Sequence, residues 1–372
     1  MPRKVTVSGG PFERGRQYGE RAGALIRKGV EFYVDMWEKG SGRSRGELIE
    51  IISGFAGRIG DFDAEILTEI EGIAAGSGLA VDDVLIVNGR YEIMLSTVFA
   101  GAPAGSGECT SLGIARAGGS GHTLVGQNWD WALPVGEVSI LLEVRQEDRP
   151  DILTHVEAGF VGHKGINSEG LALCANAMGS QLDRFEAAVP VWVLARAALN
   201  CSTIDEARRA LEPAERVASV NFTMAQRGVP GSGEGKVASL EVSPADVAVV
   251  AASPGGRASH CNVFAGSSES GPPRERGLED RLAVLYPGFC DRARRAGELI
   301  GEGEVDGERL KAILRDHANR PESICRHRED QPEELVLETL ASVVIDVSAG
   351  TLEVADGPPC SNPYRPHRLS RS

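Results

Sequence analysis

Cys109 has the clearest chemical context of any residue in this sequence. It begins the alternating pattern CTSLGIAR, directly after the loose segment GAPAGSGE, and a glycine-rich turn leads from there to a second pattern, HTLVGQNWDW. Two such patterns joined by a turn predict a hairpin. Asp130 lies near the end of the returning strand, so the hairpin would carry it back to Cys109. A cysteine that leads a strand directly after a loose segment is a candidate nucleophile.

A nucleophilic cysteine needs a base, because a thiol with a pKa of about 8.5 is only a few per cent thiolate at neutral pH. Histidine is the usual base, but no histidine here has a context that marks it as the partner of Cys109. The local signature of papain-like proteases is also absent. An unprocessed Cys/His hydrolase stays open as an alternative, and it requires one of the histidines to be indispensable. They are His122, His155, His163, His260, His317, His327 and His367.

The other candidate base is the α-amino group of Cys109, which a cut between Glu108 and Cys109 would release. An α-amine has a pKa of about 7.7 to 8.0, so a large minority is unprotonated at neutral pH. Nucleophile and base would then belong to one residue, as in the threonine–terminal amine arrangement. This chemistry requires a chain break before a strand-leading Cys, Ser or Thr, which is where Cys109 lies.

Composition narrows the range of partners. The 372 residues are 42% hydrophobic and 25% charged, with a formal net charge of −14, which disfavours nucleic-acid binding because that needs a concentrated basic surface. No stretch approaches the roughly eighteen apolar residues of a membrane span. The start, MPRKVTVSGG, lacks the apolar stretch of a signal peptide. Seven scattered cysteines without CxxC spacing favour reduced thiols, so we expect a cytoplasmic protein with no membrane or nucleic-acid partner.

Helical periodicity dominates the sequence before Cys109, and strand alternation dominates after it. Apolar residues three and four apart predict helices over 13–38, 46–59, 62–75 and 81–96, so the first hundred residues are expected to be helical. Helices are also predicted over 190–211 and 278–317, and a loop over 266–277. Strands are predicted at the two hairpin patterns and at VSILLEVRQ, ILTHVEA, 165–177, SVNFTMAQRG, ASLEVSP, DVAVVAA, TLASVVIDV and GTLEVAD. This order favours α+β layering, with one break at Ala100–Glu108.

Several blocks in order resemble one family. CTSLGIAR…GHTLVGQNWDW resembles the nucleophile segment of the isopenicillin N acyltransferase family (peptidase family C45, acyl-coenzyme A:6-aminopenicillanic acid acyltransferase-like), a branch of the N-terminal nucleophile hydrolases. GGPFERGRQYGE and EIEGIAAGSGLAVDDVLIVNGRYEI are similar to its N-terminal part. GINSEGLALCANAM, ASVNFTMAQRG, SHCNVF, PESICRH and ETLASVVIDVSAGTLEVADGPPC are similar to its later blocks.

The resemblance implies a four-layer αββα fold and a precursor that cleaves itself before the nucleophile. Residues 1–108 would form a helical N-terminal segment and 109–372 the catalytic segment, associated as one structural domain. The family's fungal acyltransferase has glycine before its cysteine, whereas this chain has Glu108. A bulky charged residue there is expected to slow or alter cleavage.

The resemblance also implies site residues, each with a plainer reading. Asp130 would orient the nucleophile and its amine; the plainer reading is a turn aspartate. Asn221 would stabilise the oxyanion; the plainer reading is an asparagine at a strand edge. Arg326 would tune the thiol or hold a substrate carboxylate, or form a structural ion pair. Three further residues are expected to line the site: Thr110, Asn176 and His260.

The predicted function is cleavage or transfer of the acyl group of amides or thioesters through a Cys109 thioester. The acceptor, water or an amine, stays open, and coenzyme A is expected only as part of a substrate, with no cofactor. A metal site from His260, Cys261, Cys325 and His327 has a spacing that fits no zinc pattern, so no metal is predicted. The alternative from another class is an uncleaved, non-catalytic binding protein on the same fold.

Overall fold

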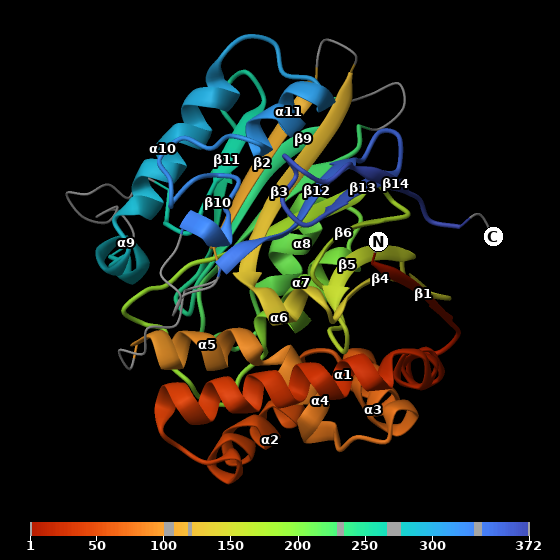
Figure 1. Ribbon diagram of the computed structural model, residues 1–372. Helices are drawn as coiled ribbons and strands as arrows, with labels where there is room; N and C mark the ends of the chain where they lie inside the picture. Colours follow the sequence, from red (N-terminus) through yellow and green to blue (C-terminus); the bar gives the residue numbers. More distant parts are fainter. Residues whose placement is uncertain are drawn as a thin grey trace.

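Two β-sheets packed face to face form the centre of the protein (Figure 1). The computed structural model describes residues 2–99, 108–117, 121–228, 234–265, 277–330 and 337–370. Most of the predicted break, residues 100–107, and all but the last residue of the predicted loop at 266–277 lie outside these ranges.

The larger sheet has the strand order β1-β4-β5-β6-β7-β8-β9-β10. β1 runs parallel to β4, and the other neighbours are antiparallel. Every residue of β5, β6 and β7 is buried, which is expected of strands covered on both faces. The strands are β1 (Arg3–Ser8), β4 (Ser139–Arg145), β5 (Ile152–Glu157), β6 (Lys164–Asn167), β7 (Leu171–Ala177), β8 (Val220–Gln226), β9 (Lys236–Val242) and β10 (Val247–Ala251).

The smaller sheet is antiparallel, with the order β11-β2-β3-β12-β13-β14. Its hairpin β2–β3 packs against β7, β8 and β9, so this hairpin joins the two sheets. The strands are β2 (Glu108–Ala117), β3 (His122–Ala132), β11 (Arg257–His260), β12 (Leu337–Asp346), β13 (Thr351–Asp356) and β14 (Arg365–His367).

Helices cover the outer face of each sheet. α10 (Gly288–Gly301) and α11 (Gly307–Leu314) pack on the smaller sheet, and α7 (Val191–Leu199) and α8 (Ile204–Leu211) pack on the larger one. The layers therefore run helix, sheet, sheet, helix, and the predicted α+β fold with four αββα layers is confirmed. Three short helices lie in connections: α6 (Leu133–Gly136), α9 (Arg281–Leu285) and a 3-10 turn (Arg328–Asp330).

The N-terminal helices form a separate layer below the ends of the sheets (Figure 1). They are α1 (Pro11–Ser41), α2 (Arg45–Phe62), α3 (Ala64–Ser77), α4 (Val81–Asn88) and α5 (Arg90–Phe99). Glycines let the backbones of α1 and α3 touch: a Cβ at Gly15 would lie 2.1 Å from the Glu69 carbonyl oxygen, and one at Gly76 would lie 2.0 Å from that of Arg16. Any side chain at these positions would push the two helices apart.

Where the predicted elements differ from the structure, local causes are visible. The helix expected over 81–96 is two helices, which meet at Gly89. Gly89 packs so closely on α2 that a Cβ there would lie 2.6 Å from Phe55. The helix over 190–211 restarts at Thr203, whose side chain caps α8, and the segment 278–317 holds three helices. The first hundred residues are not wholly helical, because β1 joins the larger sheet.

Candidate active site

Cys109 lies in β2, at the end of the hairpin nearest the N-terminal helices. The predicted hairpin is present, with Glu108 opposite Asp130 and Cys109 opposite Trp129. The Cys109 residue is 5% exposed. Trp131, two residues further along β3, donates from its indole N–H to the Tyr33 hydroxyl of α1 at 3.2 Å. The nucleophile candidate is therefore placed where the first segment of the chain meets both sheets.

Side chains hold both backbone polar atoms of Cys109. Its N–H donates to Asn262 Oδ1 at 2.9 Å, and its carbonyl oxygen accepts from Arg292 Nη1 at 2.8 Å. The second guanidinium nitrogen of Arg292 donates to the same Asn262 oxygen at 2.9 Å. Asn262 in turn donates to the Ala177 carbonyl oxygen at 2.9 Å. The strand that would otherwise pair here, β11, ends at His260, opposite Ser111, and Asn262 replaces it as the acceptor.

Burial and the charges around Cys109 keep its thiol protonated in the uncut chain. Burial raises the pKa of the Cys109 thiol to about 12, the Asp130 carboxylate adds to this, and the charges of Lys164 and Arg292 oppose it. Burial also raises the pKa of Asp130 to about 7, against the opposing effects of the Arg292 charge and of a hydrogen bond from Thr339. That bond, from Thr339 Oγ1 to Asp130 Oδ1, is 2.6 Å long. Asp130 Oδ2 is buried and has no hydrogen-bond partner among the described residues.

Asn176 of β7 and Asn221 of β8 are directly opposite each other in the larger sheet. Asn221 Nδ2 donates to Asn176 Oδ1 at 3.1 Å and to Thr223 Oγ1 at 2.9 Å. Ser111, two residues from Cys109 and on the same face of β2, donates to Asn176 Oδ1 at 2.6 Å. Within the described part of the chain, the buried Asn176 Nδ2 has no acceptor. The spare N–H groups close to the nucleophile strand therefore belong to Asn176, which Asn221 and Ser111 hold in place.

Arg326 reaches the site through its backbone. Its N–H donates to Thr339 Oγ1 at 2.9 Å, and this is the hydroxyl that donates to Asp130. The guanidinium is buried, 3.8 Å from a Glu322 carboxylate oxygen, and burial lowers its pKa to about 10. The Thr339 hydroxyl therefore connects the Arg326 backbone to the Asp130 carboxylate.

His260 and Thr110, the other two predicted site residues, form hydrogen-bonding contacts with nearby groups. His260 Nε2 lies 3.0 Å from Glu241 Oε1, and its Nδ1 lies 2.8 Å from the Cys261 carbonyl oxygen. Thr110 Oγ1 accepts from Arg292 at 3.2 Å. The residues of the weighed metal set are not gathered: His260 pairs with Glu241, whereas Cys325 lies 3.6 Å from His327 Nε2.

Two buried cations near Cys109 were missed by the sequence reasoning. The Lys164 ammonium lies 4.0 Å from the centroid of the Trp129 ring, and burial lowers its pKa to about 7, opposed by the charges of Cys109 and Glu157. Arg90 of α5 lies 4.9 Å from the Trp131 ring centroid and 3.1 Å from Glu157 Oε1. A charge inside an apolar strand segment, as in FVGHKGIN, is the signal that could have identified Lys164.

Asn262 and Arg292 were also missed as residues that bind Cys109. Asn262 lies in the SHCNVF block, of which only His260 was predicted to line the site. Arg292 lies in an ordinary amphipathic helix, α10, whose sequence gives no sign of this contact.

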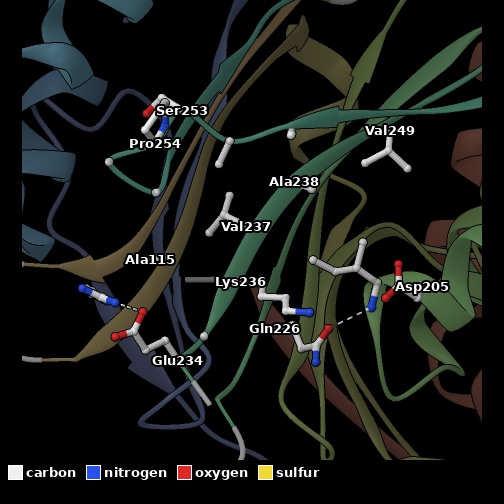
Figure 2. Close-up of a pocket in the computed structure, with 17 residues that line it drawn as sticks. Ala115, Asp205, Gln226, Glu234, Lys236, Val237, Ala238, Val249, Ser253 and Pro254 are labelled. Carbon is white, nitrogen blue, oxygen red and sulfur yellow. Dashed lines mark hydrogen bonds and ion pairs between the residues drawn. The ribbon is translucent and has the colours of Figure 1, made fainter.

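A pocket of about 480 Å³ lies at the other end of the hairpin (Figure 2). Ala115, Lys236, Val249 and Ser253 are among the residues that line it. Arg116 and Glu234, which form an ion pair, also line it. Ala115 is six residues from Cys109 along β2, which is about 20 Å in an extended strand. Cys109 does not line this pocket.

In the described ranges of the chain, no helix combines the length and apolarity needed to cross a bilayer.

Comparison with known proteins identifies the family. A family model described as acyl-coenzyme A:6-aminopenicillanic acid acyl-transferase matches residues 116–359. The chain belongs to this family. The matched range contains Asp130, Asn176, Asn221 and Arg326 and begins after Cys109.

A curated relative, the 40 kDa form of the acyl-coenzyme A:6-aminopenicillanic-acid-acyltransferase of Emericella nidulans, is 26% identical over 359 residues, covering 91% of this chain and 96% of the relative. Among solved structures, the penicillin V acylase from Agrobacterium tumefaciens is similar with a TM-score of 0.41 and 13% identity, over 67% of this chain and 83% of that one. A variant of the conjugated bile acid hydrolase from Clostridium perfringens gives 0.42 and 12%, over 70% of this chain and 99% of that one.

Proposed function

We propose that this protein is a self-processing cysteine enzyme that transfers or hydrolyses acyl groups of amides or thioesters through Cys109. One observation carries the proposal. The backbone nitrogen of Cys109, which cleavage would turn into an α-amine, already donates to Asn262 Oδ1 within the Arg292 network. An acceptor at this atom would orient the amine toward the thiol of the same residue. Family membership supports acyl transfer as the class of reaction.

Self-cleavage would begin with attack of Cys109 Sγ on the Glu108 carbonyl carbon. The thiol proton leaves Sγ, the Glu108–Cys109 C–N bond breaks, and the freed nitrogen takes up a proton. Water then hydrolyses the thioester, giving a carboxylate at residue 108 and a free thiol. The uncut chain has no α-amine to accept the first proton. Asp130 suits that step, because its pKa is raised to about 7 by burial and its Oδ2 has no partner among the described residues.

In the processed enzyme, the α-amine would take the thiol proton while Sγ attacks the substrate carbonyl. Negative charge develops on the carbonyl oxygen, and the N–H groups of the Asn176–Asn221 pair would stabilise it. The proton passes to the departing amine or thiol, leaving an acyl thioester on Cys109. Water or an acceptor amine then takes the acyl group. These steps need no cofactor, and coenzyme A would enter only as the leaving group of a thioester substrate.

The segments 1–108 and 109–372 would stay associated as one domain after the cut, since β1 is part of the larger sheet. Arg326 would hold Thr339 on Asp130, while Thr110 and His260 line the surroundings. A cytoplasmic location belongs to the proposal and is supported by cysteines that lack CxxC spacing.

The histidine-dependent alternative receives less support. Burial, with the charge of Lys164, holds the pKa of both His155 and His163 well below the ordinary value, and His260 contacts Glu241. The uncleaved binding protein is favoured by one observation: with its pKa raised to about 12, the thiol of the uncut chain is protonated at neutral pH and needs a base before it can attack. Cleavage therefore decides between the enzyme and the binding protein.

The deciding experiment is the intact mass of purified protein beside Cys109→Ala, with Cys201→Ala as the matched control. Cys201 lies outside the site and donates to the Ala197 carbonyl oxygen. We expect two fragments, the second beginning at Cys109, from the wild type and the control, and one uncut chain from Cys109→Ala. A wild-type chain that stays whole on prolonged incubation would contradict self-processing.

A further inference from the structure

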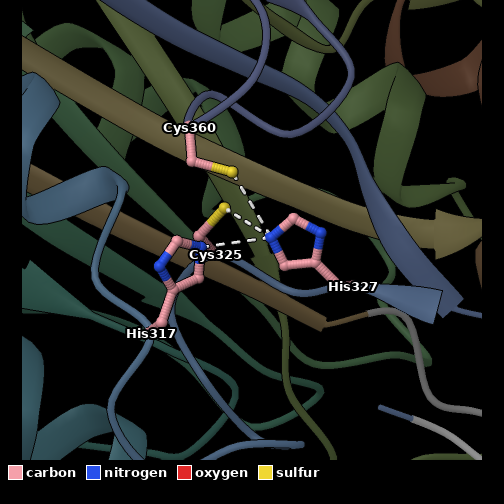
Figure 3. Close-up of side chains that lie close together, drawn as sticks. All are labelled: His317, Cys325, His327 and Cys360. Carbon is pink, nitrogen blue, oxygen red and sulfur yellow. Dashed lines mark hydrogen bonds between the residues drawn. The ribbon is translucent and has the colours of Figure 1, made fainter. Parts of the chain in front are cut away.

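A second group of cysteines and histidines lies outside the site described above. Three chain segments contribute to it (Figure 3). His317 follows α11, Cys325 and His327 precede the 3-10 turn, and Cys360 lies in the turn after β13. Their four ligand atoms all lie within 4.8 Å of one another. We call these four residues the Cys2His2 cluster.

The contacts in the cluster converge on one atom. His327 Nε2 lies 3.1 Å from His317 Nε2, 3.6 Å from Cys325 Sγ and 3.4 Å from Cys360 Sγ. An imidazole nitrogen carries either one proton or one lone pair, so it can make one good hydrogen bond, not three. A shared cation between the four atoms accounts for all the contacts at once.

The spacing of these atoms matches tetrahedral zinc. With Zn–N of about 2.0–2.1 Å and Zn–S of about 2.3 Å, neighbouring ligands in a tetrahedron are about 3.3 Å apart for two nitrogens and about 3.6 Å for nitrogen and sulfur. The observed 3.1, 3.4 and 3.6 Å are close to these values. Small side-chain rotations would complete the geometry, since no backbone movement is needed to bring the four atoms together.

We propose that the Cys2His2 cluster binds one Zn²⁺ as a closed structural site. Two thiolates and two neutral imidazoles form a common structural zinc set, and the softness of the thiolates favours zinc over magnesium or calcium. With four protein ligands there is no open position, so the ion would take no part in the reaction. A neighbouring group, His327 with Glu329 and Glu338, would compete for the same histidine, but it offers only three ligands.

The metal site would stabilise the segment that holds Asp130 in place. Arg326, between two of the ligands, donates its N–H to Thr339, which donates to Asp130. Ile324, next to Cys325, accepts a hydrogen bond of 2.8 Å from Asn128 of β3. The ion would thus tie the end of α11 and the turn after β13 to the segment that positions the carboxylate. The proposal rests on the cluster's own geometry and stands whether or not the chain cleaves itself.

The test is the metal content of the full-length protein purified without chelators, measured by inductively coupled plasma mass spectrometry. We expect about one zinc per chain in the wild type. Cys360→Ser changes the exposed ligand and should still fold, but should lose most of the zinc. Cys201→Ser is the matched control, because a serine there can make the same bond to Ala197, and it should keep the zinc.

Cobalt gives a second readout independent of activity. After chelation and addition of Co²⁺, the wild type should show the visible bands of tetrahedral cobalt and a sulfur-to-cobalt charge-transfer band. Cys360→Ser should weaken the charge-transfer band. A chelator should also lower the melting temperature of the wild type more than that of Cys360→Ser.

Three results would overturn the proposal. One is a wild-type mass lower by two hydrogens, with Cys325 joined to Cys360 as a disulfide and no metal. Another is four unmodified ligands and no bound metal, with no cobalt spectrum on titration. The third is zinc that survives Cys360→Ser but is lost on Glu338→Gln, which would assign the ion to the neighbouring group.

Discussion

Two buried carboxylates, Glu69 and Asp130, have opposite surroundings. Glu69 lies where α1 and α3 touch, and it accepts from Arg14 Nε at 2.5 Å and from both terminal nitrogens of Arg196 at 2.9 and 2.8 Å. Burial alone would raise its pKa, but the charges and hydrogen bonds of the two arginines outweigh this and hold the pKa below its ordinary value. Asp130 has one bound oxygen and one without a described partner, and its pKa is raised to about 7.

The difference suits the two carboxylates to different roles. Glu69 is charged at neutral pH, and both of its oxygens have cationic donors, so it fixes the packing of the N-terminal helices. Asp130 is close to half-protonated at neutral pH and can exchange a proton. Both residues are almost fully buried, with 1% exposure at Glu69 and 0% at Asp130. The number and charge of the hydrogen-bond donors therefore decide whether the pKa of the carboxylate is lowered or raised.

Removing the Asp130 charge should have the largest effect on function. In Asp130→Asn we expect self-cleavage and turnover of amide substrates to fall on the order of 10⁴-fold, as when the orienting carboxylate of a catalytic triad is replaced by its amide. Fragment formation by intact mass and release of a chromogenic amine measure the two rates. Activity within tenfold of the wild type would show that Asp130 is only a structural residue of β3.

Removing the Glu69 charge should affect stability instead. Glu69→Gln leaves Arg14 and Arg196 without their buried counter-charge, which should cost about 3–5 kcal/mol in the free energy of unfolding. Urea denaturation of the uncut Cys109→Ala background measures it. Glu65→Gln is the matched control, since its ion pair with Arg149 is half-exposed and should contribute about 1 kcal/mol or less. Equal losses in the free energy of unfolding in the two variants would show that Glu69 has no special structural role.

The Asn176–Asn221 pair should show a loss of intermediate size. Asn176→Ala and Asn221→Ala should each lower kcat/KM by about 10²–10³-fold, the usual cost of losing an oxyanion donor. Ser111→Ala removes a hydroxyl that bonds to Asn176 and to Thr223 but offers no donor to the oxyanion, and should cost about tenfold or less. If Ser111→Ala is as damaging as the asparagine variants, the pair acts through packing and not on the oxyanion.

The two carboxylates should also give stability slopes of opposite sign with pH. Because the pKa of Asp130 is raised from 3.8 to about 7, the folded protein holds a proton there that the unfolded chain releases. Its contribution to stability is present below pH 3.8 and is lost as the pH rises through about 7. Because the pKa of Glu69 is lowered, its contribution is present above its ordinary pKa of 4.5 and is lost as the pH falls.

Unfolding of Cys109→Ala between pH 4 and 8, with and without Asp130→Asn, measures the first slope. We expect the Asp130→Asn variant to gain stability relative to its parent as the pH rises. A difference that does not change with pH would mean that the pKa of Asp130 is not raised.

The elements predicted correctly from the sequence are those with a clear local pattern or a family block. Alternation and a turn located the Cys109–Asp130 hairpin, and periodicity located α1, α2 and α3. Short edge strands such as β11 and β14 have too few residues for a pattern, and β1 was missed because a single parallel strand precedes a long helix. Contacts between distant segments were also missed. Arg292 contacts Cys109 across 183 positions, and nothing in the local sequence of either residue indicates this.

β1 belongs to the segment before the proposed cut, yet it pairs with β4 over its whole length, from Arg3 opposite Ile140 to Ser8 opposite Arg145. Dissociation of the two pieces of a processed molecule would strip an edge strand from the sheet and break the hydrogen bond between Tyr33 and Trp131. The pieces should therefore not exchange between molecules on mixing. Specific activity should stay constant on extreme dilution, as in an enzyme made of one covalent chain.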